Sequence, residues 1–192
     1  MIRVFELLRK INLTKVSGKD LYNKFLEEFK PNKFSCDICS AKHPDWNAHN
    51  SYDRYLICFE DGKSVTYLIS IVIYTCSSCG HAHAVLPEFI IPYRSYCILF
   101  ILSVMKDYFS KSLTVEKICD KYDIAVSTLY SWKTIFLNHK KLWLGILEDV
   151  FTNLLQFVNS FSDYYLHDFF LKAGISFLQS KSRTKKARSP PG

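Results

Sequence analysis

The chain has 192 residues and a formal net charge of +7. That length allows one domain or a few small ones, and it is too short for a complete transposase, polymerase or kinase. Hydrophobic residues form 48% of the chain and charged residues 22%, which is typical of a globular protein and excludes a wholly disordered one.

The first expected elements are helices over residues 3–11 and 19–30, where apolar side chains recur at helical intervals. Ser17-Gly18 separates the two helices, and Pro31-Asn32 ends the second one. The N-terminal part is therefore expected to be helical.

The composition then changes to that of strands. Residues 51–59 and 65–75 are rich in β-branched and aromatic side chains, and they predict two long strands. The four residues between them, 60–63, have Asp-Gly at their centre, which is a strong signal for a hairpin turn. A third, short strand is expected over 83–86. From residue 93 onward the pattern predicts helices near 94–110, 114–122, 126–138, 140–160 and 162–179.

Four of the seven cysteines form two C-x-x-C pairs, Cys36 with Cys39 and Cys76 with Cys79, and 36 residues separate the pairs. Two thiolates at this spacing can bind one side of a tetrahedral zinc ion. The predicted hairpin would bring the second pair back to the first, as in a zinc ribbon, and Gly80 permits the positive φ that such a turn needs. Four thiolates leave no open position for water, so we predict one structural Zn²⁺ rather than a catalytic one.

The cysteine pairs have two alternative interpretations. A thioredoxin-like redox site needs a C-x-x-C at a strand–helix junction, and neither pair has that context. A mixed site would instead use one of the nearby histidines, which are His43, His49, His81 and His83. The remaining cysteines lie in apolar patterns, and we expect them to be buried free thiols; they are Cys58, Cys97 and Cys119.

Residues 114–137 have the pattern of a helix-turn-helix. Thr114 suits the cap of the first helix, and Asp123 stands at the tight turn, where a glycine is usual. Ser127 is a candidate cap for the second helix. The residues expected to form the buried face are Val115, Ile118, Cys119, Tyr122, Leu129, Trp132, Ile135 and Phe136. An ordinary α-hairpin is the alternative interpretation.

In a helix-turn-helix the second helix enters the major groove of DNA with its N-terminal half. The candidate DNA-contacting residues of this half are Ser127, Thr128, Tyr130, Ser131, Lys133 and Thr134. Their hydroxyls and the one lysine can contact phosphates and bases, but there is no arginine for bidentate reading of guanine. The motif therefore predicts DNA binding with a weak sequence preference or with the help of a partner.

Much of the positive charge lies in the C-terminal tail, residues 181–192, which we expect to be disordered. Its basic residues, which are further candidate DNA contacts, are Lys181, Arg183, Lys185, Lys186 and Arg188. A solvated terminus without a partner, or an anionic membrane surface, are the alternatives. No secretory signal or membrane span is expected, so the predicted location is cytoplasmic and associated with the nucleoid.

Two motifs together resemble a known group of proteins. One runs from Cys36-x-x-Cys39 through Ser-Tyr-x-Arg-Tyr (51–55) to Cys76-x-x-Cys79-Gly-His-x-His-Ala-x-Leu-Pro and Ile-Pro-Tyr (91–93), and the other is residues 124–133. The combination resembles an uncharacterised bacterial family of zinc-ribbon proteins associated with mobile elements, and its second half looks like the DNA-recognition part of insertion-sequence transposases. The resemblance covers residues 34–137 and implies recognition of element DNA. Asp123 and the arginine-free second helix depart from that pattern.

The expected fold class is therefore α+β: a small β-rich zinc ribbon followed by an all-α helix-turn-helix and a C-terminal helical hairpin. The expected segments are N-terminal helices (1–33), the ribbon (34–92), the helix-turn-helix (93–138), C-terminal helices (139–180) and the tail (181–192). The aromatic C-terminal helices either cover the helix-turn-helix core or form a surface for a dimer or partner.

The predicted function is that of a DNA-binding accessory or regulator of a mobile element, with DNA, a transposase or a second copy of the chain as partners. No enzyme is expected, because the C-terminal acids lie in helical sequence without the α/β fold that two-metal transposase chemistry uses. The alternatives are a zinc-ribbon adaptor that binds another protein, and a truncated transposase without its catalytic domain.

Overall fold

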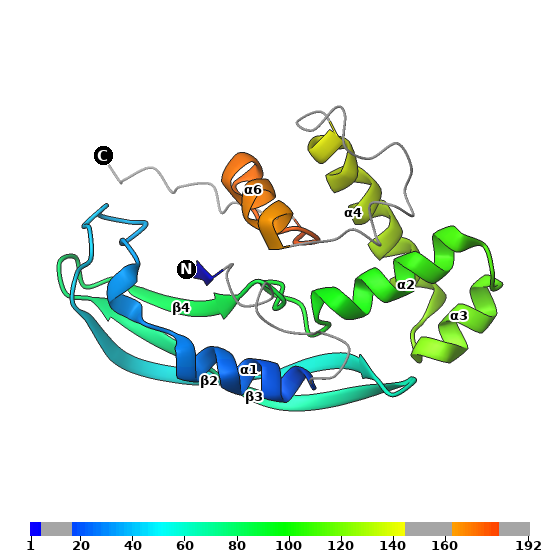
Figure 1. Ribbon diagram of the computed structural model, residues 1–192, viewed down its shortest axis with the longest axis horizontal. Coiled ribbons are helices and arrows are strands. Elements are labelled where there is room, and N and C mark those ends of the chain that lie inside the picture. Colours follow the sequence, from blue (N-terminus) through cyan, green and yellow to red (C-terminus); the bar gives the residue numbers. More distant parts are fainter. Residues whose placement is uncertain (5–16, 145–162, 181–192) are drawn as a thin grey trace, which may run out of the picture.

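A four-stranded sheet and a group of helices form the part of the chain that the computed structural model describes, residues 1–4, 17–144 and 163–180 (Figure 1). In sheet order the strands are β1 (Ile2–Val4), β4 (Ala82–Pro87), β3 (Lys63–Cys76) and β2 (Trp46–Glu60). β1 is parallel to β4, whereas β4, β3 and β2 are antiparallel to their neighbours. Strands precede most of the helices, so the expected α+β class is confirmed.

The long β2–β3 hairpin follows the predicted turn. Its register runs from Trp46 opposite Cys76 to Glu60 opposite Lys63. Asp61 and Gly62 both have positive φ, 49° and 78°, which is the geometry of a tight turn whose twist matches that of the strands. β2 begins at Trp46, earlier than the predicted residue 51, and the pairing shifts by one residue at His49.

The predicted helix over residues 3–11 is wrong at its start, because Ile2–Val4 pairs with β4 instead. Arg3 explains this preference. Its guanidinium is buried and donates hydrogen bonds to the carbonyl oxygens of Ile90 (2.7 Å) and Glu88 (3.4 Å), so tertiary contacts outweigh a local helical pattern. The rest of the predicted helix lies outside the described residues.

The second predicted helix is confirmed as α1 (Gly18–Glu28). Ser17 caps it by accepting a hydrogen bond from the Asp20 N–H at 3.1 Å. The helix lies along the β2–β3 hairpin (Figure 1). There the Tyr22 hydroxyl donates to the Ser70 carbonyl oxygen at 2.8 Å. A short 3₁₀ turn, η2 (Pro31–Lys33), follows it and leads to the first cysteine pair.

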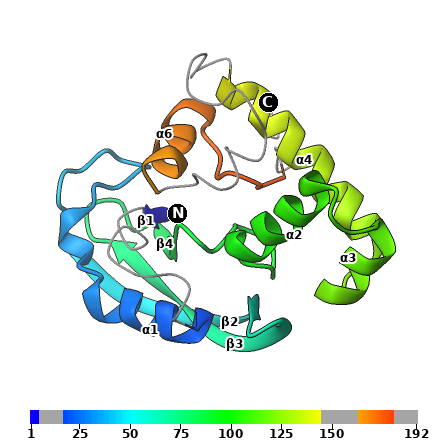
Figure 2. The ribbon, with the colours of Figure 1, turned by 45° about the vertical axis from the view of Figure 1, so that its right-hand side comes forward.

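The described residues form four further helices, α2 (Ile98–Ser110), α3 (Val115–Tyr122), α4 (Val126–Leu144) and α6 (Asp163–Ala173). Figure 2 shows α2, α3 and α4 gathered beside the sheet. α4 is continuous where we expected two helices over 126–138 and 140–160; residues 145–162 lie outside the described part. α6 ends before the predicted residue 179, and Gly174 follows it with φ 69°.

Aromatic rings connect the helices to the sheet and to one another. Phe59 of β2 lies 4.4 Å from Tyr122 of α3 between ring centroids, and the Ser64 hydroxyl donates to the Tyr122 carbonyl oxygen at 2.7 Å. The segment after α6 packs on α4, since Phe177 contacts Phe136 with ring centroids 5.9 Å apart. The described C-terminal residues thus cover the helical core, as in one of the two alternatives. No helix in the described ranges is both long and apolar enough to cross a lipid bilayer.

Candidate functional site

The two C-x-x-C pairs form two turns of the same geometry. In the first, the Ser40 N–H donates to the Cys36 carbonyl oxygen at 2.9 Å, and in the second the Gly80 N–H donates to the Cys76 carbonyl oxygen at 2.8 Å. Ser40 and Gly80 each follow the second cysteine of their pair and have positive φ, 58° and 71°. The role predicted for Gly80 is confirmed, and Ser40 has the same role in the first turn without a glycine.

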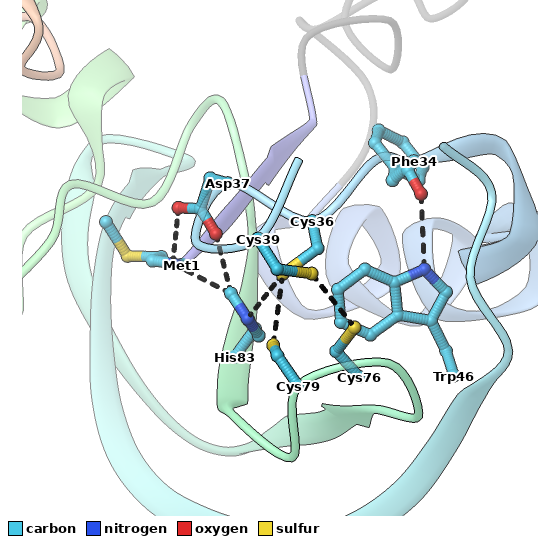
Figure 3. A network of polar contacts seen from close by, with 9 residues as sticks. All are labelled: Met1, Phe34, Cys36, Asp37, Cys39, Trp46, Cys76, Cys79 and His83. Carbon is cyan, nitrogen blue, oxygen red and sulfur yellow. Dashed lines mark hydrogen bonds and ion pairs between the residues drawn. The ribbon is translucent and has the colours of Figure 1, made fainter. Parts of the chain in front are cut away.

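The turns bring four sulfurs together, as Figure 3 shows. The Sγ atoms of Cys36 and Cys79 are 3.7 Å apart, those of Cys39 and Cys76 are 3.9 Å apart, and all four lie within 4.8 Å of one another. Thiolates bound tetrahedrally at about 2.3 Å from one ion would be about 3.8 Å apart. The cluster can therefore hold a metal ion and is compatible with a zinc site.

Neighbouring thiols of the cluster shift the pKa values of Cys36 and Cys79. Burial opposes ionisation of Cys36, but hydrogen bonds from the backbone of Cys39 and Ile38 and from neighbouring thiols lower its pKa to about 7. For Cys79 the backbone of His81 lowers the pKa, whereas burial and the other three thiols raise it to about 12 overall. Four such close sulfurs can all be thiolates only when a cation balances their charge.

His83 is the histidine that reaches this cluster. It is buried, and its Nε2 lies 3.5 Å from the Cys36 Sγ while its Nδ1 lies 2.8 Å from an Asp37 carboxylate oxygen (Figure 3). Burial, followed by the amino group of Met1, lowers the pKa of His83. Cys36, Asp37 and His83 form a second group close enough to hold a metal ion. The other three histidines considered as alternative ligands are exposed: His43, His49 and His81.

The three cysteines outside the cluster are buried free thiols, as expected: Cys58, Cys97 and Cys119. Cys97 precedes α2, and its sulfur accepts a hydrogen bond from the Phe100 N–H at 3.4 Å. This sulfur also contacts Cys58 on β2, so the two thiols link the sheet to the start of α2.

Residues 114–137 form two helices joined by a tight turn. Thr114 caps α3 through a 3.4 Å bond from the Lys117 N–H, as predicted. Asp123 has φ 50° and ψ 55°, the left-handed conformation expected at the turn. Ser127 does not cap the second helix: α4 starts at Val126, so Ser127 lies inside its first turn. The reason is that the Ala125 carbonyl already accepts the first helical bonds, from the N–H groups of residues 128 and 129.

The residues predicted to form the buried face of this segment are buried or half-buried. Leu129, Trp132 and Phe136 of α4 are at most 2% exposed, whereas Val115 and Ile135 are half-buried. The buried residues of α3 are Ile118, Cys119 and Tyr122. On the opposite face of α4, the exposed residues are Ser127, Tyr130, Ser131 and Thr134, and the half-buried ones are Thr128 and Lys133. The six candidate DNA contacts of α4 thus lie on the side of the helix away from its buried residues, with Thr128 and Lys133 at the half-buried edges of that side.

Lys133 is less available than the sequence indicates. Its Nζ donates a 2.7 Å hydrogen bond to the Tyr108 hydroxyl, which raises the pKa of Lys133. The ammonium also lies over the rings of Tyr108 and Tyr130, 4.9 and 5.5 Å from their centroids. The basic candidates of the tail lie outside the described residues: Lys181, Arg183, Lys185, Lys186 and Arg188.

A cleft of about 440 Å³ opens beside the first turns of α4. Its walls are the loop of residues 93–96 and the N-terminal part of α4; the lining residues are Tyr93, Arg94, Ser95, Tyr96, Ser127, Thr128, Ser131 and Trp132. None of these residues is acidic. Arg94 is not among the candidates predicted from residues 114–137, because it lies before α2; the Ile-Pro-Tyr motif directly before it was the available signal.

Comparisons with known proteins give one family. Residues 36–132 match the family described as a domain of unknown function, DUF6431. Neither the curated proteins nor the solved structures gave a match. The matched range begins at Cys36, the first residue of the cysteine cluster, and ends at Trp132, the last residue lining the cleft. Since this range covers just over half of the chain, the protein belongs to the DUF6431 family.

Proposed function

We propose that the protein binds duplex DNA through the exposed face of α4 and the adjoining cleft, as a non-catalytic accessory or regulator of a mobile element. One observation carries this proposal: an accessible helix face with four exposed polar residues borders a cleft that contains an arginine and no acid. A helix that presents its first turns in this way can enter a major groove, and hydroxyls there can contact phosphates and base edges.

The proposed metal is zinc, held by Cys36, Cys39, Cys76 and Cys79 as in a zinc ribbon. The donor set supports zinc, because four thiolates at tetrahedral spacing favour it over the harder divalent ions. The ion would connect the loop before β2 to the end of β3, and so would close the hairpin at its open end. Its expected contribution is to folding, since four sulfurs fill its coordination sphere.

A second candidate function is a protein adaptor, and one observation favours it. Tyr55 and Leu68 are opposite each other on β2 and β3, and both are 60% exposed. Neighbouring exposed apolar side chains on a sheet are suited to a protein partner. A transposase or a second copy of the chain would be a partner compatible with either function.

A titration of the full chain with duplex DNA tests the proposal. We expect the logarithm of the association constant to fall linearly with the logarithm of salt concentration between about 50 and 200 mM, because bound lysines and arginines displace counterions from phosphates. Absence of binding at the lowest salt would contradict the DNA-binding function. In that event a Tyr55→Ser/Leu68→Ser protein, compared with the natural chain in partner capture, would test the adaptor function.

A further inference from the structure

Arg94 has an unusual position for an arginine. It is half-buried in the wall of the cleft, and its Nε is fully buried without a hydrogen-bond partner within the described residues. No acid lines the cleft, and no described carboxylate forms an ion pair with Arg94. Burial of this charge lowers the pKa of Arg94. A partly desolvated cation without a counter-charge costs stability, and an anion from outside the chain would offset this cost.

The loop that carries Arg94 is held firmly by the sheet. The Arg54 guanidinium donates hydrogen bonds to the carbonyl oxygens of Arg94 and Ile91. The Ile57 N–H donates to the Ser95 carbonyl oxygen at 2.8 Å, and the Cys97 N–H donates to the Ile57 carbonyl oxygen at 3.0 Å. The two bonds from Arg54 explain the arginine of the Ser-Tyr-x-Arg-Tyr motif: its side chain holds the loop in place and does not face a ligand.

The opposite wall of the cleft offers groups of complementary chemistry. Ser127, Thr128 and Ser131 contribute hydroxyls there. They belong to the first turns of α4, a helix of 19 residues, whose first N–H groups have no acceptor within the helix. Tyr93 stands at the cleft with 82% of its surface exposed.

From this arrangement we infer that the cleft binds one backbone phosphate of the DNA, with the Arg94 guanidinium as its main ligand and the hydroxyls of Thr128 and Ser131 as further donors. The inference deepens the DNA-binding function proposed above and rests on it. A phosphate fits better than a base, because its charge balances Arg94 and its oxygens match the planar fork of a guanidinium. The contact would fix the register of α4 on the duplex without reading sequence.

The test compares Arg94→Gln with the natural chain in a salt titration against a fluorescently labelled random-sequence duplex. Loss of one phosphate contact should lower the salt slope by about 0.9 and weaken binding roughly five- to tenfold near 0.1 M salt. The melting temperature should not fall, because the buried Nε of Arg94 has no hydrogen-bond partner within the described residues that the substitution would remove. Arg94→Lys should keep the salt slope, since a point charge remains, while binding more weakly than the natural chain.

Lys42→Gln is the matched control. Lys42 is an exposed lysine beside the first cysteine turn, at the end of the hairpin where Trp46 pairs with Cys76. The loop bearing Arg94 is bonded to Ile57 near the hairpin tip, which is the other end. Lys42→Gln removes one positive charge, as Arg94→Gln does, but leaves the cleft intact. The salt slope and the DNA affinity should therefore change much less than in Arg94→Gln.

The outcomes separate the two proposals. If the natural chain binds DNA and Arg94→Gln binds with the same slope and affinity, or if Lys42→Gln loses as much as Arg94→Gln, the phosphate site is wrong and DNA binding stands. If the natural chain itself does not bind, the function is wrong and the phosphate site with it.

Discussion

Single residues set the geometry of both candidate sites. Ser40 and Asp123 have φ of 58° and 50°, a region that glycine occupies most easily. At Asp123 an aspartate stands where a glycine is usual, and aspartate tolerates the left-handed conformation better than most residues. At Ser40 a serine adopts the same conformation. Asp123, which departs from the usual pattern of the turn, therefore preserves the turn geometry.

At this scale the metal cluster gives the first prediction. Cys36→Ser removes one of four ligands and leaves three thiolates without a full coordination shell, so the purified protein should hold much less than one zinc per chain and melt at a lower temperature. Elemental analysis and thermal unfolding measure both effects. Cys119→Ala is the control, since Cys119 is buried outside the cluster and its loss should leave the zinc content near one. A natural chain without metal, whose melting curve is unchanged by a chelator, would refute the zinc site.

Among the secondary-structure elements, α4 has one buried side and one accessible side. One face packs into the core, where Trp132 lies 4.8 Å from Tyr96 and 6.0 Å from Phe100 between ring centroids. The other face is accessible and carries the candidate DNA contacts. Trp132 also lines the cleft, so its indole supports the wall opposite Arg94.

Trp132→Ala should therefore lower the free energy of unfolding by roughly 3–5 kcal/mol, because it removes a side chain that is 2% exposed and leaves a cavity. Denaturant unfolding followed by circular dichroism measures this. Tyr130→Ala, on the exposed face of the same helix, is the comparison and should cost much less. Equal losses for the two variants would show that the faces of α4 are assigned wrongly.

Across the whole molecule, the two candidate sites lie at different ends of the hairpin. The cysteine cluster joins the end where Trp46 pairs with Cys76, and the cleft loop is bonded to Ile57, close to the tip. A metal ion would thus contribute to the proposed DNA binding indirectly, by holding the hairpin on which the loop rests.

The final prediction separates tail and helix as sources of affinity. Deleting residues 181–192 removes five of the positive charges and should weaken binding to every DNA sequence and flatten its salt dependence. Replacing Tyr130 and Thr134, which are exposed on α4 but do not line the cleft, by alanine keeps the charge, so it should leave the slope nearly intact and reduce discrimination between a preferred site and random DNA. Salt titrations with both duplexes distinguish these effects. An unchanged slope after the deletion would mean that the folded part carries the affinity.

The sequence alone was enough to predict the features that depend on nearby residues. The Asp-Gly turn, the C-x-x-C spacing and the apolar period of α3 and α4 each act over a few positions, so the hairpin, the cysteine turns and the buried face could be anticipated. The strand at Ile2–Val4 and the approach of Arg94 to α4 could not be predicted, and the contact of His83 with Cys36 was only one of four possibilities among the nearby histidines. They join segments that are far apart in the chain, and such contacts leave no periodic pattern. The tertiary structure decided them because burial of Arg3, His83 and Arg54 in specific hydrogen-bond networks outweighs local preference.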